Sequence, residues 1–144
     1  MPLPSYRAWR FVHPDFDAAA PDSSGLQFLP SCGIAMVDGA NAVRQSLMLL
    51  LSTQPGERIM RPEFGCDLHR LVFEPNDETT AGLAIHYVRT AIARWEPRVE
   101  ILGLDAEAAA DDLSRLDIVL DYRVRVLLVT DRIVFPVSMS PMEA

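Results

Sequence analysis

Lysine is absent from this chain of 144 residues, and cysteine occurs only twice. All thirteen basic residues are therefore arginines, and twenty acidic residues outnumber them, which gives a formal net charge of −7. Such a surface disfavours nonspecific binding to nucleic acid and to anionic membranes, because both depend on phosphate neutralisation by Lys and Arg. We therefore expect neither class of partner. Arginine does suit bidentate pairing with carboxylates on a protein partner.

Long apolar runs are also missing. The longest aliphatic run, residues 47–51, is far too short to span a bilayer, and the first seventeen residues lack the apolar core of a signal peptide. The two cysteines, Cys32 and Cys66, cannot form a disulfide framework, so we expect two reduced and at least partly buried thiols. The length allows one domain with its own core. We expect a protein that is cytoplasmic when it is assembled, unless a larger structure carries it out.

The first 35 residues show no clean periodicity. Five of the eleven prolines fall there, together with several aromatic residues: Tyr6, Trp9, Phe11, Phe16 and Phe28. A merely solvated tail would have fewer aromatic side chains. We interpret residues 1–35 as an extended N-terminal arm and residues 36–144 as the folded domain. The arm could pack on its own domain or on a neighbouring subunit, and both alternatives stay open.

Two segments are predicted to be helical. From Asp38 the apolar residues follow a helical period on one face, at Val43, Leu47, Leu50 and Leu51. This helix should end at Thr53, because residues 54–57 place Pro and Gly at the centre of a type II turn. A second helix should be capped by Asn76 or Asp77 and end before Pro97. Its buried stripe is predicted at Ile85, Val88, Ile92 and Trp95.

The last third of the chain predicts strands. Residues 99–107 form a candidate strand, and strict alternation over residues 116–126 is typical of a half-buried antiparallel strand. We expect a turn around Thr130 and Asp131, and a third strand over residues 133–138. The predicted fold class is therefore α+β, with two main helices packed on a three-stranded antiparallel sheet. Its two open edges could accept a strand from another chain.

Four carboxylates fall in the segment between the two helices: Glu57, Glu63, Asp67 and Glu74. A glycosidase needs two carboxylates flanking the scissile bond, so the segment could be taken for an active site. The alternative is that these groups are solvated or pair with Arg58, Arg61 and Arg70. Because any acidic loop would satisfy the first interpretation, we favour solvation or ion pairing and predict no catalytic residue.

Metal and nucleophile signals are weaker. Cys66 and His69 lie three residues apart, and His13 has acidic neighbours at positions 15 and 17, but no zinc-binding spacing is present. Ser46 and Ser52 fall on a predicted helix without a nucleophile elbow. We therefore predict no metal site and no cofactor.

The junction between the second helix and the first strand has the sequence Glu96-Pro97-Arg98. Such a rigid corner could present a carboxylate and a guanidinium group to a partner in fixed geometry. The alternative is an ordinary helix stop followed by an arginine, and three residues alone do not decide between them.

Further motifs accompany this corner. The blocks T-Q-P-G-E-R at residues 53–58, P-E-F-G-C-D-L at 62–68, L-V-F-E at 71–74 and E-P-R-V at 96–99 occur in this order. Together, over residues 38–138, they resemble the small baseplate wedge proteins of contractile tails. That family includes the sheath-proximal wedge subunit of T-even phages, with counterparts in type VI secretion baseplates and in phage-tail-like contractile injection systems.

The resemblance implies a structural, non-catalytic subunit, with six copies in a six-fold baseplate. Glu96, Pro97 and Arg98 would dock on the core bundle of the larger wedge subunits. A second set would shape the loop beside the helices: Gly56, Arg58, Pro62, Phe64 and Gly65. Sheath protein would add strands to the sheet edge, and hub or spike proteins are further candidate partners. Some relatives carry a lysozyme-like label, so a peptidoglycan-degrading enzyme is the alternative function.

Overall fold

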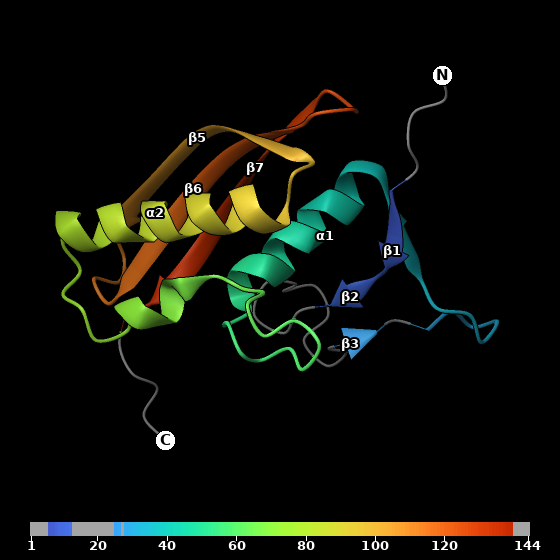
Figure 1. Cartoon of the computed structure of the whole chain (residues 1–144), viewed down its shortest axis with the longest axis horizontal. Coiled ribbons are helices and arrows are strands. Elements are labelled where there is room, and N and C mark those ends of the chain that lie inside the picture. The colour runs from blue at the N-terminus through green and yellow to red at the C-terminus, as the bar shows by residue number, and fades with distance from the viewer. Residues whose placement is uncertain (1–5, 13–24, 27, 140–144) are drawn as a thin grey trace.

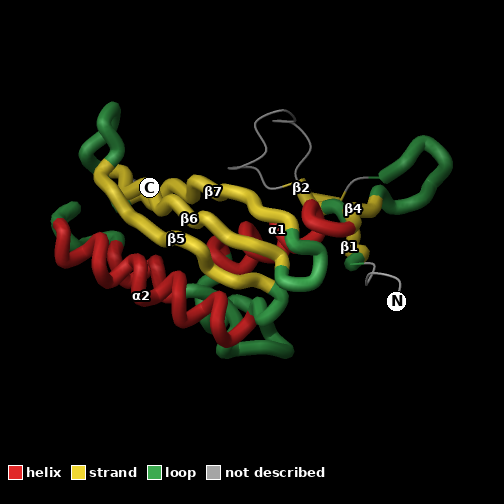
Figure 2. The backbone as a smooth tube through the Cα atoms, turned by 90° about the horizontal axis from the view of Figure 1, so that it is seen from above, coloured by secondary structure: helices red, strands yellow, loops and turns green. Residues whose placement is uncertain are grey.

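The computed structural model describes residues 6–12, 25–26 and 28–139. Its main sheet has three antiparallel strands in the order β5-β6-β7, which span Val99–Ala108, Arg115–Val124 and Val129–Ser138. Helices α1 (Gly39–Ser52) and α2 (Glu78–Trp95) lie on one side of this sheet (Figures 1 and 2). A 3-10 helix, η1 (Asp67–Leu71), lies between them in sequence. The predicted α+β class, with two helices and three strands, is confirmed.

The central strand β6 explains how the core forms. Alternate residues of this strand are almost completely buried: Leu116, Ile118, Leu120, Tyr122 and Val124. The residues between them face the other side of the sheet and are partly exposed. Helix residues complete the same core: Val43, Leu47, Leu50, Val88 and Ile92. The period-2 pattern of the strand and the 3.6-residue pattern of the helices thus converge on one apolar layer.

Both helix boundaries follow the predicted signals. After α1, the backbone N–H of Glu57 donates to the carbonyl oxygen of Gln54 (N···O 3.1 Å), and Gly56 has φ +98°, as the predicted type II turn requires. At the start of α2, the backbone N–H of Thr80 donates to the Asp77 carboxylate at 2.9 Å. This hydrogen bond lowers the pKa of Asp77 below its ordinary value.

The predicted turn before the third strand was wrong. The β6–β7 turn lies at residues 125–128, and β7 begins at Val129 rather than at residue 133. Leu128 adopts φ +53° and its backbone N–H donates to the carbonyl oxygen of Val124 at 2.8 Å. Asp131, which was expected in the turn, instead lies within the strand, and its carboxylate accepts hydrogen bonds from Arg44 and Tyr122. The register of the sheet therefore overrides the local turn preference of Thr-Asp.

Part of the predicted N-terminal arm packs on its own domain. Strand β1 (Arg7–Trp9) pairs with β4 (Met36–Asp38) beside the start of α1, and β2 (Phe11–Val12) pairs with β3 (Gly25–Leu26) (Figure 1). The Gln45 side chain of α1 joins both strands: it donates to the Trp9 carbonyl oxygen and accepts from the Phe11 backbone N–H, each at 2.8 Å. Residues 1–5, 13–24 and 27 lie outside the described part, and the boundary at residue 35 stays a prediction.

The two cysteines are both free, as predicted, but their environments differ. Cys66 is 2% exposed, and burial raises the pKa of its thiol to about 12. Cys32 is exposed, so the expectation that both thiols are partly buried was wrong for this residue. Among the described residues, no helix has the length and apolarity that a bilayer span needs.

Candidate docking site at the helix-to-strand corner

The corner formed by Glu96, Pro97 and Arg98 is held by backbone hydrogen bonds on both sides. The N–H of Glu96 donates to the Ile92 carbonyl oxygen at 2.9 Å and so closes the last turn of α2. The N–H of Arg125, in the β6–β7 turn, donates to the Arg98 carbonyl oxygen at 2.9 Å. Because Pro97 also has a restricted φ, the path of the chain from α2 into β5 is rigid.

Within the corner, Arg98 and Glu96 form a bidentate ion pair. Arg98 Nε donates to Glu96 Oε1 at 2.6 Å, and Arg98 Nη2 donates to Oε2 at 2.8 Å. The same Nη2 donates to Ser46 Oγ on α1 at 3.2 Å, and the guanidinium lies 4.9 Å from the centroid of the Tyr6 ring. The hydrogen bonds that Arg98 donates to Glu96 raise the pKa of Arg98 above its ordinary value, so its positive charge is stabilised.

The two charged side chains of the corner are not equally accessible. The Glu96 side chain is 6% exposed and both of its oxygens accept from Arg98, whereas the Arg98 side chain is 31% exposed and Pro97 lies on the surface. The interpretation in which both charges face a partner therefore needs revision. The Glu96 carboxylate faces the interior and orients the Arg98 guanidinium. A partner can reach Pro97 and the outer part of Arg98.

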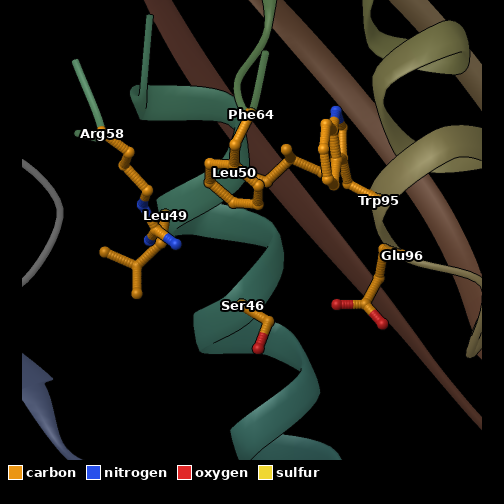
Figure 3. Close-up of a pocket in the computed structure, with 7 residues that line it drawn as sticks. All are labelled: Ser46, Leu49, Leu50, Arg58, Phe64, Trp95 and Glu96. Atoms are coloured by element: carbon orange, nitrogen blue, oxygen red, sulfur yellow. The ribbon is translucent and has the colours of Figure 1, made fainter. Parts of the chain in front are cut away.

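A pocket of about 180 Å³ lies next to the corner. Figure 3 shows Ser46 and Glu96 on one side of it and the Phe64 and Trp95 rings on the other. Leu49, Leu50 and Arg58 complete its lining. Helix α1, the end of α2 and the intervening loop thus meet at one concave surface.

The loop of residues 54–65 forms the outer wall of this pocket. The Arg58 guanidinium lies 4.0 Å from the centroid of the Phe64 ring, and Phe64 contacts Trp95 edge-on with 5.3 Å between ring centroids. Glu63 forms an ion pair with Arg94 of α2. Three consecutive side-chain layers, Arg58, Phe64 and Trp95, therefore connect the loop to α2.

Gly65 closes the loop where no other residue would fit. Its φ is +139°, and a Cβ at this position would lie 2.5 Å from the Thr53 carbonyl oxygen. That carbonyl oxygen also accepts from the backbone N–H of Cys66 at 2.9 Å. Of the remaining predicted loop residues, Gly56 occupies the type II turn, and Pro62 is exposed in a turn closed by a hydrogen bond from the Phe64 N–H to the Arg61 carbonyl oxygen.

The carboxylates of the loop segment do not converge. Asp67 lies 3.6 Å from Arg70, as expected, but Glu63 pairs with Arg94 and not with Arg58 or Arg61. The pairing alternative was therefore wrong for Arg58 and Arg61, and Glu57 and Glu74 are exposed, as the solvation alternative expects. None of the four loop-segment carboxylates lines the pocket, where the acidic residue is Glu96.

Sequence reasoning missed the contribution of Ser46, which was considered only as a nucleophile. Its hydroxyl donates to the Ala42 carbonyl oxygen at 3.0 Å and accepts from Arg98, so it is a positioning group. The sequence could have indicated this role, because Ser46 lies one helical turn before Leu50 on an otherwise apolar stripe. Within the described ranges, no group of three or more His, Cys, Asp or Glu could hold a metal ion, and residues 13, 15 and 17 lie outside those ranges.

The fold and the corner define a small structural module built around an antiparallel sheet and a rigid helix-to-strand junction. Residues 37–127 match the family model described as baseplate wedge protein gp25. This match covers more than half of the chain and includes both helices, the loop and the corner. The chain therefore belongs to the baseplate wedge protein gp25 family, and the resemblance noted in the sequence is confirmed.

Three relatives illustrate the family. The baseplate wedge protein gp25 of Enterobacteria phage T4 is 32% identical over 76 residues, which cover 53% of this chain and 58% of the phage protein. A crystal structure from Geobacter sulfurreducens, provisionally named a tail lysozyme, is 36% identical with a TM-score of 0.67 and covers 76% of this chain and 100% of that chain. A chain of the six-fold symmetrised anti-feeding prophage baseplate is 28% identical with a TM-score of 0.70, covering 83% of this chain and 86% of that chain.

Proposed function

We propose that this protein is a non-catalytic structural subunit of a contractile-tail baseplate wedge, and that its corner docks on the larger wedge subunits. The observation that carries the proposal is the Glu96–Arg98 pair, in which a buried carboxylate holds a partly exposed guanidinium beside an exposed proline. A group that is already oriented loses little conformational freedom when a partner binds. The helical core bundle of the larger subunits is the proposed partner.

The sheet supports a second part of the proposal, in which sheath protein adds strands to it. In the described chain, β5 and β7 are the outer strands of the three-stranded sheet, and an outer strand can extend its ladder with a strand from another chain. We therefore propose that the subunit anchors or initiates the sheath. One copy for each of six wedges agrees with the six-fold symmetry of the related anti-feeding prophage baseplate.

The alternative function, a peptidoglycan-degrading enzyme, fits the site less well. Hydrolysis of a glycosidic bond needs a carboxylic acid and a second carboxylate at the same site. The pocket-lining Glu96 is engaged by Arg98 through both oxygens, and Glu63 is engaged by Arg94. Peptidoglycan hydrolysis by the purified protein that disappears in Glu63→Gln or Glu57→Gln would contradict the structural proposal.

Docking at the corner can be tested with a double variant that keeps the fold. Glu96→Leu/Arg98→Met replaces both partners by apolar side chains, so neither an unpaired charge nor an unpaired amide is left buried and stability should change little. The matched control is Asp121→Asn/Arg132→Met, which removes a similar bidentate pair on the opposite face of the sheet.

Each variant would be co-expressed with the larger wedge subunits of the same particle and the complex purified. We expect the corner variant to lower the yield of complex at least about tenfold and the control variant to leave it unchanged. Wild-type yield for a folded corner variant would show that the corner is only a helix stop.

A further inference from the structure

The tip of the 54–65 loop exposes two large apolar side chains. Ile59 is 95% exposed and Met60 is 88% exposed, the highest values for large hydrophobic residues in the described chain. Exposing such side chains together in water is unfavourable, by about 25 cal/mol for each Å² of apolar surface, and adjacent exposed apolar residues are typical of interaction sites.

The loop holds this tip in one conformation. Ile59 and Met60 occupy the centre of a turn in which the Arg61 N–H donates to the Arg58 carbonyl oxygen at 3.3 Å. Arg58 itself packs on Phe64, and the following turn ends at the tightly packed Gly65. A tip that is already ordered loses little entropy when it binds.

The charges beside the tip indicate the chemistry of its partner. Arg58 and Arg61 flank the two apolar residues, and neither has a carboxylate partner in the part of the chain that the structure describes. The nearby carboxylate of Glu63 is already paired with Arg94. An apolar pair between two unpaired cations is complementary to an apolar pocket with carboxylates at its rim.

The loop that carries the tip lines the same concave surface as the corner. Arg58 and Phe64 of the loop line the pocket together with Trp95 and Glu96 (Figure 3). One partner surface can therefore cover the corner and the loop at the same time.

We infer that Ile59 and Met60 form a second docking point, which inserts into an apolar pocket with a carboxylate rim on the larger wedge subunit that contacts the corner. This inference rests on the proposed function, because it assigns the loop to the same partner. It gives the loop a binding role in addition to the shaping role that the family resemblance implies.

The apolar part is tested with Ile59→Ser/Met60→Ser, in the full chain co-expressed with the larger wedge subunits. The matched control is Phe73→Ser/Leu113→Ser, which changes two residues that are 84% and 77% exposed near the other end of α2. We expect the loop variant to lower the yield of complex at least about tenfold and the control to keep it at the wild-type level. Thermal unfolding of each isolated chain should give nearly the wild-type midpoint, since all four residues are on the surface.

The carboxylate rim is tested with Arg61→Glu, which leaves the Arg58–Phe64 contact in place. Arg89→Glu on α2 is the control for the change in net charge. We expect Arg61→Glu to weaken the complex several-fold and to do so less at high salt, because its effect is electrostatic. If Arg61→Glu leaves the yield of complex unchanged, the inference of a carboxylate rim on the partner is wrong.

The outcomes separate this inference from the proposed function. If the corner variant loses the complex and the serine variant of the loop keeps it, the loop inference is wrong and the docking corner stands. If only the loop variant loses the complex, the loop is the docking point and the corner proposal is wrong. If both variants keep the complex at the wild-type level, both proposals are wrong.

Discussion

The 54–65 loop and the corner lie against the same pocket, but they are held in shape by different forces. The loop depends on backbone geometry: two glycines with positive φ, successive turns and a stack of Arg58, Phe64 and Trp95. The corner also has backbone hydrogen bonds, but its side chains depend on charge, because a carboxylate that is almost fully buried is neutralised by one guanidinium. The loop motif and the corner motif line one pocket, but packing holds the first in shape and an ion pair holds the side chains of the second.

This difference has a consequence for mutagenesis. A change in the loop should act through strain and packing, and salt should affect it little. A change in the corner should act through an uncompensated charge, so that its cost depends on whether the partner residue is changed too. The following experiments are ordered by the expected loss in the free energy of unfolding.

Gly65→Ala should have the largest effect. The added Cβ would lie 2.5 Å from the Thr53 carbonyl oxygen at a φ of +139°, so the loop must move or the backbone must be strained. We expect a loss of about 3 kcal/mol in urea unfolding. Gly82→Ala in α2 is the control, because nothing lies within 4 Å of its added Cβ and the helix should gain up to about 1 kcal/mol. Equal effects at the two glycines would mean that the loop is not rigid.

Arg98→Ala should rank second. It leaves the Glu96 carboxylate buried without its partner, and we expect a loss of about 2 kcal/mol, less than for a fully buried pair since the Arg98 side chain is 31% exposed. Glu96→Leu/Arg98→Met, which leaves neither charge nor amide unpaired, should restore most of this loss. A double variant that is as unstable as the single one would show that packing, and not charge, holds the corner.

Alkaline pH should destabilise the end of the loop through Cys66. Burial raises the thiol pKa from 9.0 to about 12, so the unfolded chain loses this proton at lower pH than the folded chain does. The stabilisation from this thiol is fully present below pH 9 and is lost as the pH rises toward 12. At pH 10 the loss in unfolding free energy should be about 1 kcal/mol. Cys66→Ala should reduce the difference in unfolding free energy between pH 8 and pH 10 by that amount. If Cys66→Ala shows the same difference between pH 8 and pH 10 as the wild type, the Cys66 thiol is in contact with solvent and is not buried.

Arg58→Ala should have the smallest effect on stability. It removes a cation–π contact on an exposed side chain, for which we expect a loss of about 0.5 kcal/mol. Arg61→Ala, which removes no such contact, should leave the unfolding free energy unchanged. If the two variants are equally stable, the Arg58–Phe64 layer contributes nothing to the loop.

Periodicity and local turn and capping signals predicted most of the secondary structure. The end of the first helix at Thr53, a cap at either Asn76 or Asp77 and the alternation along β6 all depend on local chemistry, which a single sequence displays. The β6–β7 turn could not be predicted in this way. Its position is decided by the pairing of Val129 with Val124, and Leu128 accepts a left-handed conformation to allow it. Leucine seldom occupies a left-handed turn position, so the sequence around Leu128 does not indicate a turn there.

The candidate site shows the same division. The order and spacing of the motif blocks identified the family without any coordinates, because each block records a local requirement for a turn, a tight packing position or a helix end. Only the tertiary structure decided that Glu96 faces inward and that Ser46, 52 positions from Arg98, accepts a hydrogen bond from the guanidinium of the ion pair. It also decided that Ile59 and Met60 are left uncovered. Burial and pairing depend on which distant segments meet, and that information appears only when the two helices and the sheet pack together.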